Sequence, residues 1–126
     1  KVDLVLCPSA TETILGVERV NRCASARSIE LGCYVGVSHL TGKADSALID
    51  FSLGCAALYS PSQSAFKETI RHLQTPVYES GNEALRVTID KHLLDRARRI
   101  RVETNPANLG RKAAGMERLI HLETNC

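Results

Sequence analysis

The chain has 126 residues, of which 44% are hydrophobic and 24% charged, so it is long enough to form one domain with a packed core. The 16 basic and 14 acidic residues leave a net charge of +2, which argues against a nucleic acid or another strongly charged partner. No apolar run approaches the length of a membrane span, so we also expect no membrane partner.

The first 36 residues indicate a strand, a polar loop, an amphipathic helix and a second strand. Apolar residues at 2–7 predict a buried strand that Pro8 closes, because proline cannot donate to a sheet ladder. The polar loop 9–13 follows, then a helix over 17–31 that Gly32 ends, and then a strand over 33–38. A unit of this length is a βαβ crossover, so the two strands should pair in parallel.

The helix over 17–31 has apolar residues at roughly helical spacing, and we expect them on its buried side. They are Val17, Val20, Cys23, Ala24, Ala26, the stem of Arg27, and Leu31. The polar outer side would consist of Glu18, Arg19, Asn21, Arg22 and Ser25. Arg27 and Glu30 are three residues apart and should pair with each other.

The rest of the chain predicts further strands and one more helix. Two short apolar runs, 47–51 and 55–60, flank a connector with Gly54 and indicate a hairpin or a bulged bend. Residues 61–76 are mostly loop, with a possible helical turn at 65–73. Residues 84–89 alternate in polarity, as a strand with one solvated face does. Asp90 should cap a helix over about 91–102, and we expect a short helix at 113–122 in the tail.

The cysteines and histidines do not form a metal site by their spacing. Five cysteines, at 7, 23, 33, 55 and 126, contain no CxxC pair and make an odd number, so we expect reduced, buried thiols in a cytoplasmic protein. The four histidines fall in different elements without ligand spacing, and no glycine-rich phosphate loop is present. We therefore expect no metal and no cofactor.

Several segments in order resemble the carbon–nitrogen hydrolases of the nitrilase superfamily. They are Pro8-Ser9-Ala10 after a strand, Ala26-Arg27 and Ile29-Glu30 on the helix, Cys33-Tyr34-Val35 on the next strand, and 51–61. The Asn that follows the Glu in the family is Leu31 here. Thr88-Ile89-Asp90 with the helix after it resembles the last strand and helix of the family, which extends the resemblance to about residue 101.

The resemblance implies an α/β fold that is part of a four-layer α-β-β-α sandwich with mixed sheets. Residues 1–112 would be the C-terminal half of the hydrolase domain, and 113–126 a C-terminal tail. Because the chain begins with Lys directly in a predicted strand, we expect it to be a fragment of a longer protein. The family also assembles through a helix that matches 17–31, which implies a homodimer or a higher homo-oligomer.

The function that the resemblance implies is cleavage of a non-peptide amide, nitrile or carbamoyl group through a cysteine acyl-enzyme. The Glu, Lys and Cys of that mechanism belong to the first half of the family, so no catalytic residue is expected in this chain. The family shapes its substrate pocket with the loop that corresponds here to Ser9, Ala10, Thr11, Glu12 and Thr13. The alternative for this loop is a solvated turn with a helix cap.

Two other interpretations remain at this point. Cys7 ends a strand where open sheets bind ligands, but Pro8 follows it and would remove a backbone N–H that often serves an oxyanion. We therefore interpret Cys7 as a small apolar strand residue rather than as a nucleophile. The chain as a whole could instead be a non-catalytic α/β interaction or regulatory domain on the same scaffold.

Overall fold

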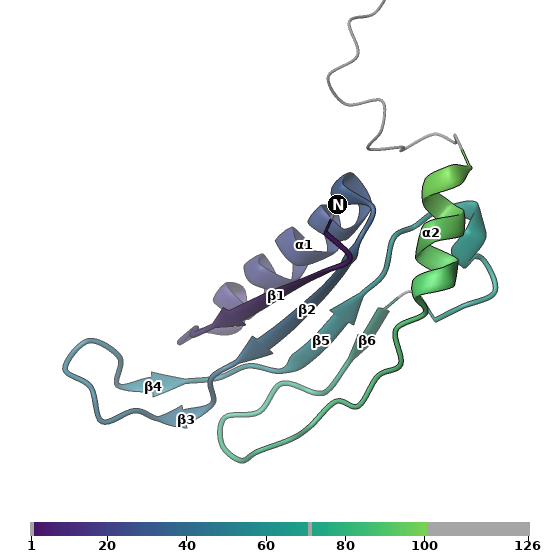
Figure 1. Cartoon of the computed structure of the whole chain (residues 1–126). Helices are drawn as coiled ribbons and strands as arrows, with labels where there is room; N and C mark the ends of the chain where they lie inside the picture. The colour runs from purple at the N-terminus through teal and green to yellow at the C-terminus, as the bar shows by residue number, and fades with distance from the viewer. Residues whose placement is uncertain (1, 71, 101–126) are drawn as a thin grey trace, which may run out of the picture.

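The computed structural model of the chain describes residues 2–70 and 72–100 (Figure 1). In this part, two α-helices, one short 3-10 helix and six strands follow one another along the chain. Their bounds are β1 Leu4–Ser9, α1 Ile14–Leu31, β2 Tyr34–His39, β3 Gly42–Lys43, β4 Phe51–Ser52, β5 Ala56–Tyr59, η1 Ser64–Phe66, β6 His72–Gln74 and α2 Lys91–Arg99. The predicted mixed α/β class is confirmed, and the predictions for 101–126, including a helix at 113–122, lie outside the described residues.

The main sheet has four strands in the order β1-β2-β5-β6. β1 and β2 pair in parallel, and β2–β5 and β5–β6 pair antiparallel, so the sheet is mixed as predicted. Helix α1 packs on one face of this sheet, while α2 lies on the opposite face at the end where β2 begins (Figure 1). The first strand, helix and second strand therefore form the predicted crossover.

Strand β1 runs past the proline that we expected to end it. Pro8 pairs with Ser38 inside the strand, so the bounds 2–7 were wrong by two residues at each end. The carbonyls of Asp3 and Ser9 accept from the N–H groups of Tyr34 and Leu40, so the odd residues of β1 face β2. The even residues, including Pro8, direct their backbone groups toward the open edge. A proline is tolerated there because its missing N–H has no partner to lose.

Helix α1 begins three residues earlier than predicted and ends where predicted. Thr13 caps it by accepting a hydrogen bond from the N–H of Gly16, and Gly32 ends it with φ +57°. Its buried row consists of Val17, Asn21, Ala24 and Ser28. Two predictions for its faces were wrong: Asn21 lies inside, while Cys23, Ala26, Arg27 and Leu31 are exposed. The polar residues face inward because the sheet offers them hydrogen-bond partners.

The connections after β2 differ most from the sequence prediction. The runs 47–51 and 55–60 do not pair with each other, because β4 pairs with β3 and β5 joins the main sheet. The region 61–76, predicted as mostly loop with a helical turn at 65–73, contains the short helix η1 at Ser64–Phe66 and strand β6. Residues 84–89 form no strand, although Leu85, Val87 and Ile89 are half-buried and alternate with exposed neighbours. The alternation of burial was therefore predicted correctly, but the segment has no ladder partner.

The core is divided between the two faces of the main sheet. On the α1 side, Ala24, Val35, Val37 and Ala57 pack together with Cys33 and Tyr59. On the other side, Tyr34 and Phe66 contact edge to face, with 5.9 Å between ring centroids, and pack against Leu94 and Ala97 of α2. The described residues contain no helix that is both long and apolar enough to cross a membrane.

Arg98 joins the end of α2 to the beginning of β1. Its guanidinium binds the carboxylate of Asp3, the carbonyl of Val2 and the carbonyl of Gly32, which is the C-cap of α1. The Arg98 and Lys91 side chains lower the pKa of Asp3 by hydrogen bonding to its carboxylate. The last turn of α2 is basic, with Arg96, Arg98 and Arg99. Of these, Arg98 has a structural role through the contacts just described.

Candidate functional site

The loop predicted to contact substrate lies where the parallel strands β1 and β2 both end. Ser9 is the last residue of β1 and pairs with His39, the last residue of β2. In open α/β sheets, ligands bind at this carboxyl edge of parallel strands. The crossover therefore places Ser9, Ala10, Thr11, Glu12 and Thr13 at the expected edge.

The five residues of the loop have different surroundings. Ala10 and Glu12 are exposed, and Ser9 is half-buried with its carbonyl bound to the N–H of Leu40 at 2.8 Å. The Thr13 hydroxyl caps α1 by accepting from the N–H of Gly16, which agrees with the alternative prediction of a solvated turn with a helix cap. Thr11 is the residue that ties the loop to the rest of the molecule.

Thr11 is held through both its backbone and its side chain. Its carbonyl accepts from the N–H of Leu53 at 2.9 Å, and its hydroxyl donates to the carbonyl of Leu53 at 3.0 Å. The same hydroxyl oxygen lies 3.2 Å from Nδ1 of His39. Leu53 stands between β4 and β5, so the loop after β1 is fixed to a segment about forty residues away in sequence.

His39 is the centre of a polar network beneath this loop. Its ring is buried, and Nε2 lies 3.3 Å from Oδ1 of Asn21 on α1. Burial lowers the pKa of His39, since the charged ring loses hydration. Gly54 packs directly against it: a methyl group added there would overlap Cβ and Cγ of the histidine. The position of this ring is therefore closely confined.

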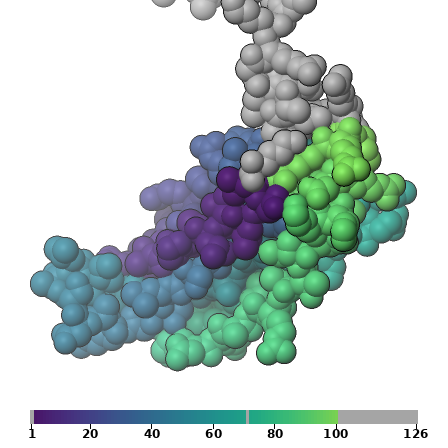
Figure 2. Space-filling view, viewed as in Figure 1, coloured from purple at the N-terminus to yellow at the C-terminus, as the bar shows by residue number. Residues whose placement is uncertain are grey.

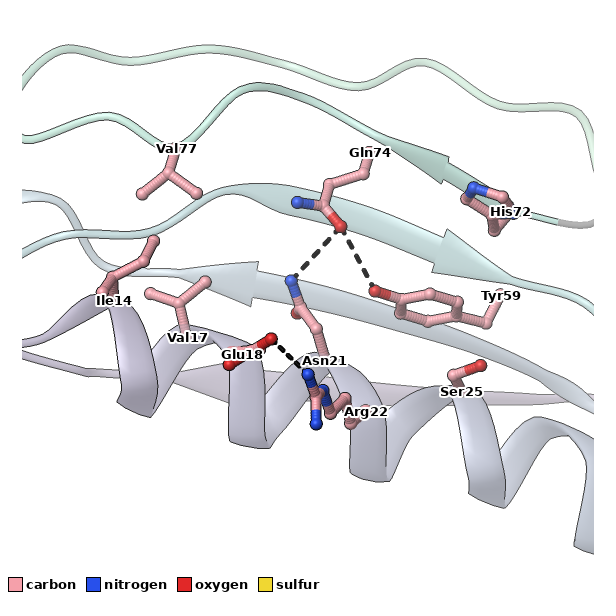
Figure 3. A pocket seen from close by; sticks show the side chains of 10 residues that line it. All are labelled: Ile14, Val17, Glu18, Asn21, Arg22, Ser25, Tyr59, His72, Gln74 and Val77. Carbon is pink, nitrogen blue, oxygen red and sulfur yellow. Dashed lines mark hydrogen bonds and ion pairs between the residues drawn. The ribbon is translucent and has the colours of Figure 1, made fainter.

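Asn21 continues the network across the sheet to strand β6 (Figure 3). Its Nδ2 donates to Sγ of Cys55 at 3.3 Å and to Oε1 of Gln74 at 3.4 Å. The Tyr59 hydroxyl donates to the same oxygen of Gln74 at 3.5 Å. Loop, helix and three strands thus share one chain of hydrogen bonds: Thr11, His39, Asn21, Gln74 and Tyr59.

The far end of the network opens into a groove of about 470 Å³ beside α1. Figure 3 shows Asn21, Gln74 and Tyr59 at its floor, with Glu18 and Arg22 paired on the helix at its rim. Burial raises the pKa of Tyr59, so the phenol keeps its proton and remains a donor. This groove presents amide and hydroxyl groups rather than an unpaired charge.

A second groove, of about 530 Å³, lies on the face of the sheet away from α1. Its walls are mostly apolar and come from β1, β2, β5 and the segment 83–89, among them Leu4, Leu6, Leu58, Leu85 and Val87. In Figure 2, β1 (purple) and the 80s segment (green) lie on the face turned to the viewer. Leu6 is 72% exposed there, although it belongs to a strand of the main sheet.

The cysteines only partly follow the sequence expectation. Cys33 and Cys55 are buried, and burial raises the pKa of the Cys33 thiol. Cys7 is half-buried inside β1, where it pairs with Val37, so the expectation that it ends the strand was wrong. Cys23 is exposed, which corrects its predicted place on the buried side of α1. Cys126 lies outside the described residues. Within 2–70 and 72–100, no group of three His, Cys, Asp or Glu side chains is arranged to hold a metal ion.

Sequence reasoning gave too little weight to Asn21, His39 and Gln74. Adjacent residues of a strand point to opposite faces, and accordingly Ser38 is exposed and His39 is buried. A signal for Asn21 was present, since it lies four residues after Val17 and three before Ala24, on the apolar stripe itself. No comparable signal marked Gln74, because β6 was not predicted.

Comparison with known proteins gives no relative for this chain. No family model matches it, and neither a curated protein nor a solved structure is similar enough to be counted as a match.

Proposed function

We propose that this chain is the C-terminal half of a carbon–nitrogen hydrolase that cleaves a non-peptide amide, nitrile or carbamoyl group. The observation that carries the proposal is the parallel β1–α1–β2 crossover with the Pro8-Ser9-Ala10 loop at its carboxyl edge. The resemblance to the nitrilase superfamily rests on this unit. In the structure, strand β1, the loop and helix α1 follow one another in the expected order.

The part of the main sheet that α2 leaves uncovered, on the face away from α1, supports the same proposal. In an α-β-β-α sandwich, two sheets pack face to face and helices cover their outer sides. Here α1 covers one face, while Leu4, Leu6 and Leu58 line an open apolar groove on the other. The proposal accounts for this groove as the surface on which the other sheet of the sandwich packs.

In the proposed mechanism, a cysteine thiolate outside this chain attacks the carbon of the substrate. With an amide or carbamoyl group, the C–N bond breaks and the protonated amine or ammonia leaves as the acyl-enzyme forms. With a nitrile, a thioimidate forms first, and water then replaces its nitrogen, which leaves as ammonia. A glutamate moves protons, a lysine stabilises the oxyanion, and water then releases the acid. None of these three residues is assigned to a position here. The role of this chain is to shape the substrate pocket with Ser9, Ala10, Thr11, Glu12 and Thr13.

The test uses the full protein encoded by the gene, incubated with a panel of simple amides, nitriles and N-carbamoyl amino acids. We expect ammonia release, and we expect iodoacetamide to inactivate the enzyme by alkylating a cysteine that precedes Lys1. The Cys7→Ser variant should keep its activity. Alkylation at Cys7, with loss of kcat in a folded Cys7→Ser variant, would place the nucleophile in this chain and overturn the assignment.

The full protein also separates the hydrolase from the non-catalytic domain. A full-length protein that releases no ammonia from any member of the panel, and has no reactive cysteine before Lys1, would favour an interaction or regulatory domain. The 126-residue chain alone should turn over none of these compounds.

A further inference from the structure

The hydrogen-bond geometry around His39 does not fit a neutral ring. The Thr11 hydroxyl has one hydrogen, which it donates to the carbonyl of Leu53. Toward Nδ1 of His39, the hydroxyl oxygen is then an acceptor, so Nδ1 must carry a hydrogen. The Oδ1 atom of Asn21 accepts only, so Nε2 must carry a hydrogen as well. Only the imidazolium form satisfies both contacts at once.

Burial opposes that charged form, so at neutral pH one of the two contacts has to change. The Asn21 contact is the more constrained, because its amide hydrogens are directed to Gln74 and Cys55. Reversing Asn21 would also require the Gln74 amide to reverse and the Tyr59 hydroxyl to change from donor to acceptor, so three groups would have to change together. The Thr11 hydroxyl, by contrast, needs only a rotation about one bond.

We propose that His39 is a positioning residue for the loop 9–13, and that its protonation decides whether the Thr11 hydroxyl donates to His39 or to Leu53. With a neutral ring, Nε2–H donates to Asn21, and Nδ1 accepts the hydroxyl hydrogen of Thr11. When Nδ1 takes a proton from solvent, it donates to Thr11, whose hydroxyl then donates to the carbonyl of Leu53. In the protonated state alone, the Thr11 side chain thus adds a second hydrogen bond to Leu53, beside the one from the N–H of Leu53 to the carbonyl of Thr11.

Other ionisable groups around the network come from four segments: the connection before β5, the connection after β6, helix α1 and the loop 9–13. Cys55, Tyr78 and Glu83 line a small cavity of about 170 Å³ together with His39. Glu83 bonds to Tyr78 and raises the pKa of that phenol. On α1, Glu18 and Arg22 pair with each other near the exposed groove, and Glu12 of the loop is exposed. His39 differs from these groups because it contacts the network at two atoms, Thr11 through Nδ1 and Asn21 through Nε2.

An effect of this switch on substrate binding by the loop 9–13 rests on the proposed function. The switch itself is tested on the 126-residue chain. Long-range proton–nitrogen NMR spectra of the histidine rings report the tautomer directly. We expect His39 to be neutral at pH 7.5 with its hydrogen on Nε2. As the pH falls, the carbonyl carbon of Leu53 should shift with the same midpoint as the His39 ring. An Nδ1–H tautomer at pH 7.5 would overturn the proposal.

Matched threonine variants isolate the hydroxyl. Thr11→Val should abolish the shift of the Leu53 carbonyl, and Thr11→Ser should retain it. Thr41 provides the control, since it lines the same small cavity as His39 but its hydroxyl donates to the carbonyl of Gly81 at 2.8 Å. Thr41→Val should leave the Leu53 titration unchanged. A titration that persists in Thr11→Val refutes the switch, and the wild-type tautomer decides the matter if that variant fails to fold.

The proposed hydrolase is tested separately, because the spectra require no substrate. If ammonia release by the full protein fails while the His39 and Leu53 titrations coincide, the switch stands and the function does not. If the full protein is active and the two titrations differ, the function stands and the switch does not.

Discussion

The two faces of the main sheet are built in different ways. The face under α1 is covered by the helix except at the groove beside Tyr59 and Gln74, and its buried polar groups make hydrogen bonds: Asn21 with His39 and Gln74, and Ser28 with the carbonyl of Ser60. The opposite face is apolar, closed by α2 at one end and open along β1 at the other. The face under α1 obtains specificity from hydrogen bonds with fixed partners, whereas the open face holds apolar surface available to another layer.

The largest effect is expected from a cavity on the part of the open face that α2 covers. Leu94 is fully buried, so Leu94→Ala should lower the free energy of unfolding by about 3 kcal/mol. Leu6, on the uncovered part, is 72% exposed, and Leu6→Ala should cost less than about 1 kcal/mol. Urea unfolding followed by circular dichroism measures both. Equal losses would mean that the groove along β1 is already closed.

A pair of glycines compares the two faces directly. Gly54→Ala would push a methyl group into His39 and should destabilise the chain by about 2–3 kcal/mol. The methyl of Gly36→Ala would lie 3.2 Å from Cδ2 of Leu6, an exposed side chain that is free to move. We expect Gly36→Ala to leave stability unchanged or to raise it by about 0.5 kcal/mol, since alanine suits a strand better than glycine. The same urea titration serves, and a neutral Gly54→Ala would show that the His39 ring is not confined.

A substitution of Arg98 tests the contact between α2 on one face of the sheet and the end of α1 on the other. Its side chain is only 10% exposed, and Arg98→Gln should cost about 1–3 kcal/mol because the buried carbonyl of Gly32 and the Asp3 carboxylate lose a charged donor. Arg99→Gln, on the exposed side of the same turn, should change little. Thermal unfolding of the two variants at pH 7 makes the comparison.

The same contact should appear in the acid dependence of stability. The pKa of Asp3 is lowered in the folded chain, so the unfolded chain binds the proton more readily. The stabilisation is therefore complete above the ordinary pKa of about 3.8 and is lost as the pH falls through the lower folded value. Asp3→Asn should flatten the stability curve below pH 4. An unchanged curve in that variant would assign acid unfolding to other groups.

The smallest effect concerns the accessibility of the groove. A dye that binds apolar surface should fluoresce with the chain, and Leu6→Ser should reduce that signal. Leu48→Ser makes the same change at a residue that is 90% exposed and outside the groove, and it should not. Sedimentation at increasing concentration tests the expected self-association. A monomer without dye binding would contradict an available apolar face.

The sequence by itself determined the elements whose signals are local. Gly32 ends α1 as predicted, Asp90 caps α2 through its bond to the N–H of Leu93, and the spacing of strand, helix and strand required a parallel crossover, whereas the start of α1 was predicted three residues too late. Helix caps and crossovers act over a few residues or a fixed length, so a pattern contains them. The place of the loop 9–13 at the sheet edge followed from the same unit.

The tertiary structure alone decided which partners the remaining residues found. The alternation at 84–89 predicted a strand, but no neighbouring edge is paired with it, and β6 took the place beside β5. Asn21 looked like a surface residue until β2 and β6 brought His39 and Gln74 to it. Strand pairing and buried hydrogen bonds depend on groups that are distant in sequence, which is why the polar network under the loop could not be read from the chain alone.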